Sequence, residues 1–339
     1  VPGTPVRPRN GKLTAGVCAA IATGFGVPSD SQLPLLRATG PDVKEEPKLI
    51  LGGGSNLLFT KDFEGMVLLN GIKGMEVLRE DGGYTYVRAG GGEKWHDLVL
   101  FCLENDLGGI ENMSLIPGTV GAAPLQNIGA YGVELKDVFV ELEAVQLETG
   151  EVHTFDKEAC QFGYRESVFK HSLKGQYVVT AVTLRLRKNP ELNTSYGAIQ
   201  ATLQEMQIQQ PTIHDVSAAV CHIRRSKLPD PVQIGNAGSF FKNPEIPVLL
   251  FDVLKEKYPE MPAYPVSESS VKVPAGWLIE QCGWKGKVID NYGVHKNQAL
   301  VLVNYGGAKG ENLLQLAQDI IQSVKEKFGI ALQPEVNII

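Results

Sequence analysis

The sequence predicts an α+β fold in two or three domains, and three observations support this. The chain has 339 residues, more than the roughly 100–200 residues of one usual domain. Hydrophobic residues make up 43% and charged residues 21%, which is the composition of a globular protein with a sizeable core. Segments with the two-residue period of a strand are mixed with segments of helical period, and no internal repeat occurs.

Composition also argues against several classes of protein. A net charge of −6 disfavours nucleic acid as a partner. The five cysteines are odd in number, far apart and without a CxxC pair, which disfavours disulfides and zinc and favours a reducing cytosol. The histidines form no HExxH or HxxxH pair, so we expect no metal. No apolar run of about 18 residues and no signal-peptide pattern occurs, so we expect a cytoplasmic protein without a membrane span.

Alternating or uniformly apolar segments predict the strands. Residues 48–51 read as a short buried strand, and residues 84–89 as a strand that ends at three glycines, 90–92. Apolar and acidic residues alternate over 140–144, ahead of a turn at 148–151 and a second strand at 152–155, which indicates a hairpin. Apolar residues at 182, 184 and 186 alternate with Thr183, Arg185 and Arg187, so this strand should have one wet face.

Helical spacing predicts three helices. One begins near Trp95 and should stop at Gly108 and Gly109. A second covers 216–225, with Asp215 as its cap. A third buries Leu313, Leu316, Ala317, Ile320, Val324 and Phe328 and stops at Gly329. Residues 189–215 are polar and contain two prolines, which indicates a domain junction, whereas residues 1–47 show no clear period beyond a charged stretch at 43–47.

Two glycine-rich segments are candidates for holding a dinucleotide. The first is residues 51–56, Leu-Gly-Gly-Gly-Ser-Asn, in which glycines let backbone N–H groups approach phosphate oxygens. No helical period follows it, so it is not the Rossmann pattern. The second is residues 116–132, with four glycines and two prolines, whose buried backbone groups need a partner such as a pyrophosphate and a flavin. A tight turn and a long structured turn are the plain alternatives.

Together with three further motifs, these segments resemble the MurB family of UDP-N-acetylenolpyruvoylglucosamine reductases. The motifs are Gln-Phe-Gly-Tyr-Arg-Glu-Ser at 161–167, Gly-Asn-Ala-Gly-Ser-Phe-Phe-Lys-Asn-Pro at 235–244 and Leu-Gln-Pro-Glu-Val at 332–336. The resemblance extends from about residue 48 to residue 335. It implies the FAD-binding fold of the vanillyl-alcohol-oxidase type in two lobes, 1–65 and 66–215, plus a C-terminal α+β substrate domain, 216–339.

The resemblance also implies the cofactor and its contacts. FAD would bind without a covalent bond, because neither glycine segment offers an obvious His or Cys attachment site. The flavin contacts would fall on Gly52, Gly53, Gly54, Ser55, Asn56, Pro117, Gly118, Thr119, Gly121, Ala122, Gln126, Asn127, Gly129, Ala130, Tyr131 and Gly132. The Asn-Thr-Phe-Gly-like strand with which family members usually begin is not found in this sequence.

Three residues match the family's catalytic positions. Arg165 would hold the substrate carboxylate with a two-pronged contact. Glu335 would donate to the developing enolate oxygen, which commonly contributes about 3–4 kcal/mol. Ser239 would deliver a proton to the α-carbon. Taken singly, each residue has a plainer role: Arg165 as a surface ion pair with Glu166, Ser239 as a turn residue after Gly238, and Glu335 as a solvated carboxylate.

Further positions match residues near the nucleotide-sugar substrate. Arg224 and Lys227 would share a helix face and supply cationic donors for the diphosphate. Tyr196 resembles the mobile tyrosine of the subtype with an extra loop over the substrate. The complete set of expected substrate residues is Tyr164, Tyr196, Arg224, Lys227, Asn243, Tyr264 and Gln298. A solvated helix end and ordinary aromatic packing are the alternatives.

The implied reaction is the reduction of UDP-N-acetylglucosamine enolpyruvate in peptidoglycan precursor synthesis. The family uses one pocket first for NADPH and then for the enolpyruvyl substrate, and we expect a monomer. Two other hypotheses stay open: a different oxidase or dehydrogenase on the same FAD fold, and a nucleotide-sugar binding protein without flavin chemistry. Finding Arg165, Ser239 and Glu335 together disfavours the last of these.

Overall fold

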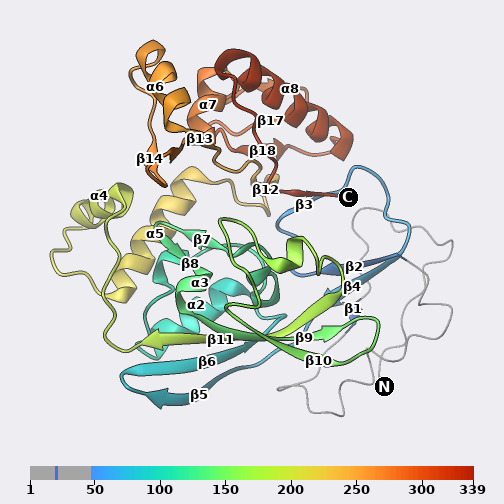
Figure 1. Ribbon diagram of the computed structural model, residues 1–339, viewed down its shortest axis with the longest axis vertical. Coiled ribbons are helices and arrows are strands. Elements are labelled where there is room, and N and C mark those ends of the chain that lie inside the picture. Colours follow the sequence, from blue (N-terminus) through green and yellow to red (C-terminus); the bar gives the residue numbers. More distant parts are fainter. Residues whose placement is uncertain (1–19, 22–46) are drawn as a thin grey trace. The chain divides into compact units, whose positions relative to one another are not determined.

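The computed structural model describes residues 20–21 and 47–339, which form two compact units (Figure 1). In this described part, the first unit contains residues 20–21, 47–54 and 63–224, and the second contains residues 55–62 and 225–339. The described part does not include Cys18 or the charged residues 43–46. It also leaves out most of the N-terminal segment in which the family strand was expected.

A five-stranded antiparallel sheet forms the centre of the first unit, in the order β10-β9-β11-β6-β5 (Figure 1). Its strands are β5 (Met75–Asp81), β6 (Tyr84–Gly90), β9 (Phe139–Gln146), β10 (Val152–Asp156) and β11 (Tyr177–Arg187). The expected hairpin is confirmed as β9 and β10, and the expected strand before the three glycines is β6.

One expectation for β11 is wrong in part. Arg185 and Arg187 are exposed, but Thr183 is only 5% exposed. Thr183 lies opposite Arg88 on β6, and the Arg88 side chain reaches along the sheet to Glu143, 2.8 Å from Nε to Oε1. Cross-strand neighbours lie within side-chain contact, so this partly buried ion pair shields the threonine from solvent.

A smaller parallel sheet, β1-β4-β2, carries the first glycine segment. Its strands are β1 (Ala20–Ile21), β2 (Lys48–Leu51) and β4 (Met66–Asn70). β2 is the expected strand, and the chain leaves it directly into the glycines at 52–54. No helix follows them; the next element is β3 (Leu57–Leu58), as the non-Rossmann interpretation requires.

Helix α2 (Trp95–Glu104) buries the expected apolar face, but it ends earlier than expected. Asp106 takes a left-handed conformation, φ 56°, and Leu107 N–H bonds back to Cys102 O. A short polar side chain tolerates this conformation better than most residues, so Asp106, rather than Gly108 and Gly109, terminates the helix.

Residues 189–215, which we expected to be a domain junction, lie within the first unit. They contain α4 (Gly197–Glu205), which packs on α5 (Ile213–Lys227) through a small apolar cluster within the first unit. The cap of α5 is Thr212 rather than Asp215. Asp215 is the third residue of the helix, and its carboxylate accepts from the backbone N–H and the hydroxyl of Thr212, as in a capping box. These bonds lower the pKa of Asp215.

Short elements complete the first unit. Helix α3 (Leu135–Val138) follows the paired strands β7 (Gly129–Ala130) and β8 (Val133–Glu134). Single 3₁₀ turns cover η2 (Glu111–Met113), η3 (Val120–Ala122), η4 (Pro124–Gln126) and η5 (Val168–Lys170). The second glycine segment is therefore a chain of turns rather than one long helix or strand.

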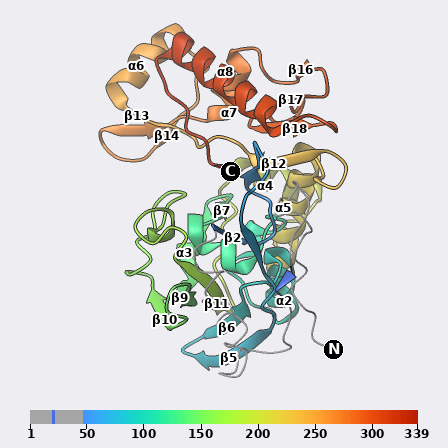
Figure 2. The same ribbon diagram turned by 90° about the vertical axis from the view of Figure 1, so that its right-hand side faces the viewer.

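The second unit has its own apolar core, sheets and helices. One antiparallel sheet contains β12 (Gly235–Ser239), β18 (Val301–Asn304), β17 (Tyr292–Val294) and β16 (Val288–Ile289). Another contains β13 (Glu245–Pro247), β15 (Ser270–Lys272) and β14 (Tyr264–Pro265), and β19 (Asn337–Ile338) pairs with β3. The helices are α6 (Val248–Lys257), α7 (Ala275–Gln281) and α8 (Gly310–Phe328), and α8 lies against β17 and β18 (Figure 2).

The C-terminal helix confirms its sequence pattern completely. All six residues expected on its apolar face are buried in the core of the second unit. Gly329 ends the helix in a left-handed conformation, φ 70°, which glycine adopts without the steric cost of a Cβ.

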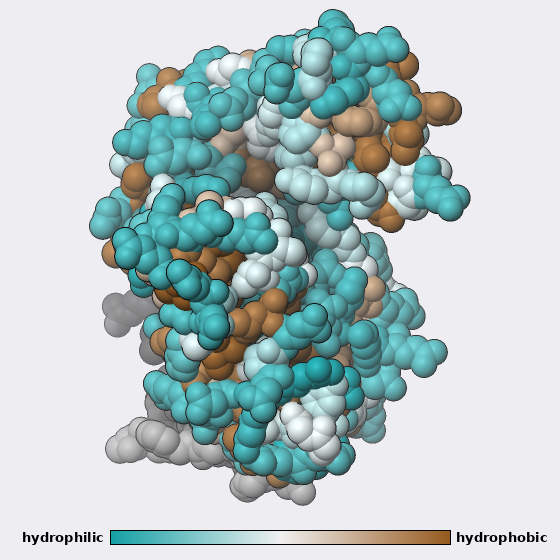
Figure 3. Space-filling model, turned by 90° about the vertical axis from the view of Figure 1, so that its left-hand side faces the viewer, coloured by the Kyte–Doolittle hydropathy of each residue, from teal (hydrophilic) through white to brown (hydrophobic). Residues whose placement is uncertain are grey.

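Exposed apolar side chains gather on α6 and near β14. Leu249 is 80% exposed and Val253 is 65% exposed, one helical turn apart, and Val266 is 46% exposed. Brown spheres of this kind stand among the teal polar side chains in Figure 3. Within residues 20–21 and 47–339, no helix is both long enough and apolar enough to cross a membrane.

The two units differ from the expected division at residues 65 and 215. Both expected FAD-binding lobes fall in the first unit, apart from residues 55–62, which belong to the second. The later boundary falls after Arg224, because helix α5 continues through residue 215 and packs in the first unit.

Candidate functional site

The two glycine segments meet within the first unit. A Cβ added to Gly53 would lie 3.0 Å from the Cα of Gly118, and one added to Gly52 would lie 2.4 Å from Oγ1 of Thr119. Such distances leave no room for a side chain. The sequence could suggest both segments as candidates, but only the fold shows that they face each other.

The hydroxyl of Thr119 stands out at this contact. Its Oγ1 is buried and has no hydrogen-bond partner among the described residues. A buried hydroxyl without a partner costs free energy unless a ligand satisfies it. Neighbouring backbone groups are in use: Val120 N–H donates to Glu93 O and Gly121 N–H donates to Gly91 O, each at 2.8 Å. Backbone hydrogen bonds thus hold the turn in place, whereas the Thr119 hydroxyl has no partner among the described residues.

Asn127 joins the second glycine segment to the loop that carries Arg165. It is fully buried, and its amide nitrogen donates to Gly163 O at 3.0 Å and to Glu134 Oε2 at 3.2 Å. Its Oδ1 accepts from Lys136 N–H at 3.0 Å. Asn127 is one of the residues expected to contact the cofactor, and its side chain connects these chain segments.

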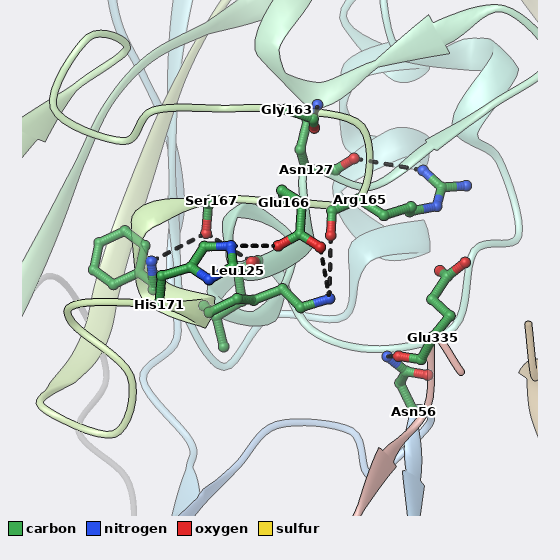
Figure 4. A network of polar contacts seen from close by, with 11 residues as sticks. Asn56, Leu125, Asn127, Gly163, Arg165, Glu166, Ser167, His171 and Glu335 are labelled. Carbon is green, nitrogen blue, oxygen red and sulfur yellow. Dashed lines mark hydrogen bonds and ion pairs between the residues drawn. The ribbon is translucent and has the colours of Figure 1, made fainter. Parts of the chain in front are cut away.

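The guanidinium of Arg165 contacts the second glycine segment (Figure 4). Nη2 donates to Gly129 O at 2.8 Å, and Nη1 lies 3.5 Å from Asn127 O. The ring of Tyr164 lies 5.5 Å from the guanidinium carbon. The carboxylate of Glu166 contacts Nε2 of His171 at 2.8 Å. A planar guanidinium can bind a carboxylate through two parallel N–H bonds.

Backbone strain concentrates around the same segment. Leu115, Asn127, Tyr131 and Arg165 all have positive φ, between 43° and 58°. Residues other than glycine in this region cost about 1–3 kcal/mol each and often mark functional sites. Four such residues lie in and around the second glycine segment. Contacts from other segments, rather than local conformational preference, therefore set the backbone conformation there.

Tyr131, Tyr196 and Arg224 form a second group in the first unit. The rings of Tyr131 and Tyr196 meet edge to face with centroids 5.3 Å apart. Arg224 lies close enough to Tyr131 for each side chain to shift the pKa of the other, and its Nε donates to Leu115 O at 3.2 Å. Burial raises the pKa of Tyr131, which the Arg224 charge opposes, and burial lowers the pKa of Arg224, which Tyr131 opposes.

Two asparagines fix the loop that carries Tyr196. The Asn112 amide donates to Tyr131 O at 3.0 Å and to Asn193 O at 2.8 Å. Asn193 in turn donates to Gly132 O at 3.1 Å. Tyr196 is itself 44% exposed. The tyrosine loop is therefore tied at its base to the end of the second glycine segment.

The second unit brings Ser239 and Glu335 onto neighbouring segments. Glu335 N–H donates to the carbonyl of Phe240, the residue after Ser239, at 2.8 Å. Asn56, from the first glycine segment, donates to Glu335 O at 3.3 Å (Figure 4), and Asn337 N–H donates to Asn56 O. A serine, a glutamate and part of a glycine segment, far apart in sequence, thus meet in one unit.

Four expected substrate residues also lie in the second unit. Asn243 and Gln298 lie at the start of α7: Asn243 Oδ1 accepts from Ala275 N–H at 2.9 Å, and Gln298 Oε1 lies 3.3 Å from a Cβ built on Gly276. Lys227 is an exposed residue at the end of α5, and Tyr264 is 54% exposed on β14. The helix expected to carry Arg224 and Lys227 is confirmed as α5.

All the expected cofactor residues lie in the two glycine segments. In the first unit these are Gly52, Gly53, Gly54, Pro117, Gly118, Thr119, Gly121, Ala122, Gln126, Asn127, Gly129, Ala130, Tyr131 and Gly132, whereas Ser55 and Asn56 belong to the second unit. Sequence reasoning missed Asn112, Lys170 and Asn193, which hold site loops in place. Only Lys170 carried a signal, as a lysine three residues after the recognised motif at 161–167.

Comparison with known families identifies the cofactor class. Residues 42–156 match the model of the FAD binding domain family. The geometry fits such a group: the matched range contains both glycine segments, the close approach of Gly53 to Gly118 and the unsatisfied Thr119 hydroxyl. The expected class, an α+β protein with a FAD-binding domain, is confirmed.

The C-terminal part of the chain matches the model of one enzyme family. Residues 230–339 match the model "UDP-N-acetylenolpyruvoylglucosamine reductase, C-terminal domain". Proteins with that reductase name include one from Flavobacterium johnsoniae, 54% identical over 87% of this chain and 88% of its own, and one from Chromobacterium violaceum, 50% identical over 97% and 96%. The crystal structure of the Thermus caldophilus reductase (MurB) has the same fold, with a TM-score of 0.62 at 23% identity over 92% of this chain and 90% of its own. The chain therefore belongs to the UDP-N-acetylenolpyruvoylglucosamine reductase family.

Proposed function

We propose that this chain reduces the enolpyruvyl ether of UDP-N-acetylglucosamine to UDP-N-acetylmuramate, a peptidoglycan precursor, and consumes NADPH. One observation carries the proposal: Arg165 rests on the carbonyls of Asn127 and Gly129, within the expected flavin-binding segment. A fixed cation at that position suits an anionic substrate that must react next to a flavin. The names of relatives about 50% identical over nearly the whole chain support the same reaction.

Both glycine segments would hold FAD, with Thr119 Oγ1 as a donor to its phosphates. FAD, when bound, supplies the hydride that the β-carbon of the substrate receives. The protein contributes binding, orientation and charge stabilisation.

The three catalytic residues have distinct tasks in this proposal. Arg165 binds the carboxylate of the enolpyruvyl group and stabilises the charge that builds on it. Glu335 donates to the developing enolate oxygen, a contribution commonly about 3–4 kcal/mol. Ser239 delivers the proton to the α-carbon. The last two already share a pair of hydrogen-bonded segments in the second unit.

The other site residues would bind the nucleotide sugar. Tyr164, Tyr196, Arg224, Lys227, Asn243, Tyr264 and Gln298 provide cationic, amide and aromatic groups for the diphosphate, the sugar and the uracil ring. We place the monomeric enzyme in the cytoplasm, which suits the four free cysteines of the described residues.

An anaerobic titration tests the reaction. Addition of NADPH to the FAD-loaded protein should bleach the flavin absorbance, and addition of the enolpyruvyl substrate should restore it. Protein that stays colourless after FAD is added would instead favour a binding protein. Bleaching that the enolpyruvyl substrate fails to reverse would favour another flavin-dependent oxidase or dehydrogenase.

Thr119→Val tests the fit of the cofactor. The change keeps the shape and removes the hydroxyl, so FAD affinity should fall by about fivefold or more, as for the loss of about 1 kcal/mol of hydrogen bonding. The flavin-free protein should become slightly more stable, because a buried polar atom without a partner is removed. Fluorescence titration and thermal unfolding measure the two effects. Thr154→Val, at an exposed strand position, is the control, and unchanged FAD affinity in Thr119→Val would remove the hydroxyl from the cofactor site.

Ser239→Ala tests the proton donor. Flavin reduction by NADPH should stay intact, while flavin reoxidation by the enolpyruvyl substrate slows by about 10²-fold or more. Stopped-flow absorbance separates the two half-reactions. Ser269→Ala, at an exposed position, should change neither. Equal slowing of both half-reactions in Ser239→Ala would contradict the proton-donor role.

A double-mutant cycle tests whether Arg165 and Glu335 act on the same step of the proposed reaction. Arg165→Met and Glu335→Gln should each slow reoxidation, and the double variant should lose less than the product of the single effects, because both groups stabilise the same developing charge. Lys285 is exposed and serves as the control. In the double variant Arg165→Met with Lys285→Met, the loss in reoxidation rate should equal the product of the two single losses. Multiplicative losses for Arg165 and Glu335 would mean that they act independently.

A further inference from the structure

The turn that carries Arg165 holds this residue in an unfavourable backbone conformation. Gly163 and Glu166 exchange two backbone hydrogen bonds, at 3.0 and 3.3 Å, and close a tight four-residue turn. Arg165 has φ 56° within it, a value that costs a residue with a Cβ conformational free energy. Contacts outside the residue must therefore hold this conformation.

Lys170 makes a contact directly on the strained peptide. Its ammonium donates to the carbonyl oxygen of Arg165 at 3.1 Å. Its side chain is only 22% exposed, and the nitrogen lies 4.0 Å from Glu166 Oε1. The other oxygen of that carboxylate contacts His171 (Figure 4). A charge-assisted bond of this kind is stronger than a neutral one, so it is well placed to fix the orientation of the peptide.

Other contacts tie the ends of the loop rather than its centre. Ser167 Oγ donates to Leu125 O at 2.7 Å, and the Asn127 amide donates to Gly163 O at 3.0 Å. These bonds attach the loop to the flavin-binding segment on either side of Arg165. Loss of Lys170 would leave both in place, so the loop would stay attached while the Arg165 peptide gained freedom to leave the left-handed region.

The direction of the guanidinium depends on that peptide. With the present backbone, the Arg165 side chain reaches Gly129 O at 2.8 Å. A change of φ at Arg165 would redirect its Cα–Cβ bond and move the guanidinium away from this position. Orientation before binding matters, because a group that must be ordered during binding loses affinity for the ligand it holds.

We propose that Lys170 is a positioning residue that presents Arg165 to the carboxylate of the substrate. Its ammonium holds the Arg165 carbonyl, the peptide stays left-handed, and the guanidinium meets the enolpyruvyl carboxylate already oriented. The inference rests on the proposed function and adds a residue to it. Glu166 supports Lys170 by placing a negative charge beside the ammonium.

Two ligands that differ by the enolpyruvyl group separate this role from others. Calorimetry with oxidised, FAD-loaded full-length protein measures binding of UDP-N-acetylglucosamine enolpyruvate and of UDP-N-acetylglucosamine, which has no carboxylate. Lys170→Met should weaken the enolpyruvyl ligand by about tenfold and leave the plain nucleotide sugar within about twofold. Lys170→Arg should restore much of the selective affinity, because it can still donate to a carbonyl.

Lys174→Met is the matched control, since this lysine is exposed and four residues further along; it should leave both affinities unchanged. Flavin content and thermal unfolding report whether each variant is folded. If Lys170→Met yields no folded flavoprotein, Glu166→Gln replaces it, because it keeps the lysine and removes its anionic neighbour. A smaller loss, again confined to the enolpyruvyl ligand, is then expected.

The outcomes separate the positioning role of Lys170 from the proposed function itself. Equal weakening of both ligands in Lys170→Met would overturn the positioning role in favour of a contact with the diphosphate. Unchanged affinity for both would overturn it as well, because Arg165 would then be oriented without Lys170. Wild-type protein that fails to bind the enolpyruvyl ligand would overturn the proposed function and the inference with it.

Discussion

The buried side chain of Asn127 is the connection on which the first-unit site depends. Its amide and carbonyl oxygen satisfy Gly163 O, Glu134 Oε2 and Lys136 N–H at once. A buried amide is favourable only when its groups are paired, so the turn of the second glycine segment and the loop of Arg165 must stay together. Because of this connection, a segment suited to a flavin and a cation suited to a carboxylate become parts of one rigid structure.

Strain and rigidity are linked in this unit. Positive φ values at Leu115, Tyr131 and Arg165 accompany hydrogen bonds that reach these residues from elsewhere: Arg224 bonds Leu115 O, Asn112 bonds Tyr131 O and Lys170 bonds Arg165 O. In each case a side-chain donor binds the carbonyl of the strained residue. Donors from other segments thus hold conformations that the local sequence disfavours.

The second unit uses the backbone for the same purpose. Ser239 ends strand β12 and Glu335 follows Pro334, and the bond from Glu335 N–H to Phe240 O fixes one relative to the other. Asn56 adds a contact to Glu335 O from residues 55–62. These backbone bonds hold an acid and a hydroxyl group on paired segments, as the proposed delivery of a proton to a defined carbon requires.

The sequence by itself determined the elements whose patterns are local. The face of α8, the hairpin of β9 and β10, the strand before the first glycines and the family motifs could all be read from residues close together in the chain. The ends of helices were harder to predict from the sequence. Asp106 ends α2 and Thr212 caps α5, because several nearby residues could have taken either role. Only the tertiary structure decided the links Asn127 to Gly163, Asn112 to Asn193 and Asn56 to Glu335, which join residues 36, 81 and 279 positions apart. A hydrogen bond between distant segments leaves no periodic trace in the sequence, because its partners are selected by the fold and not by their neighbours.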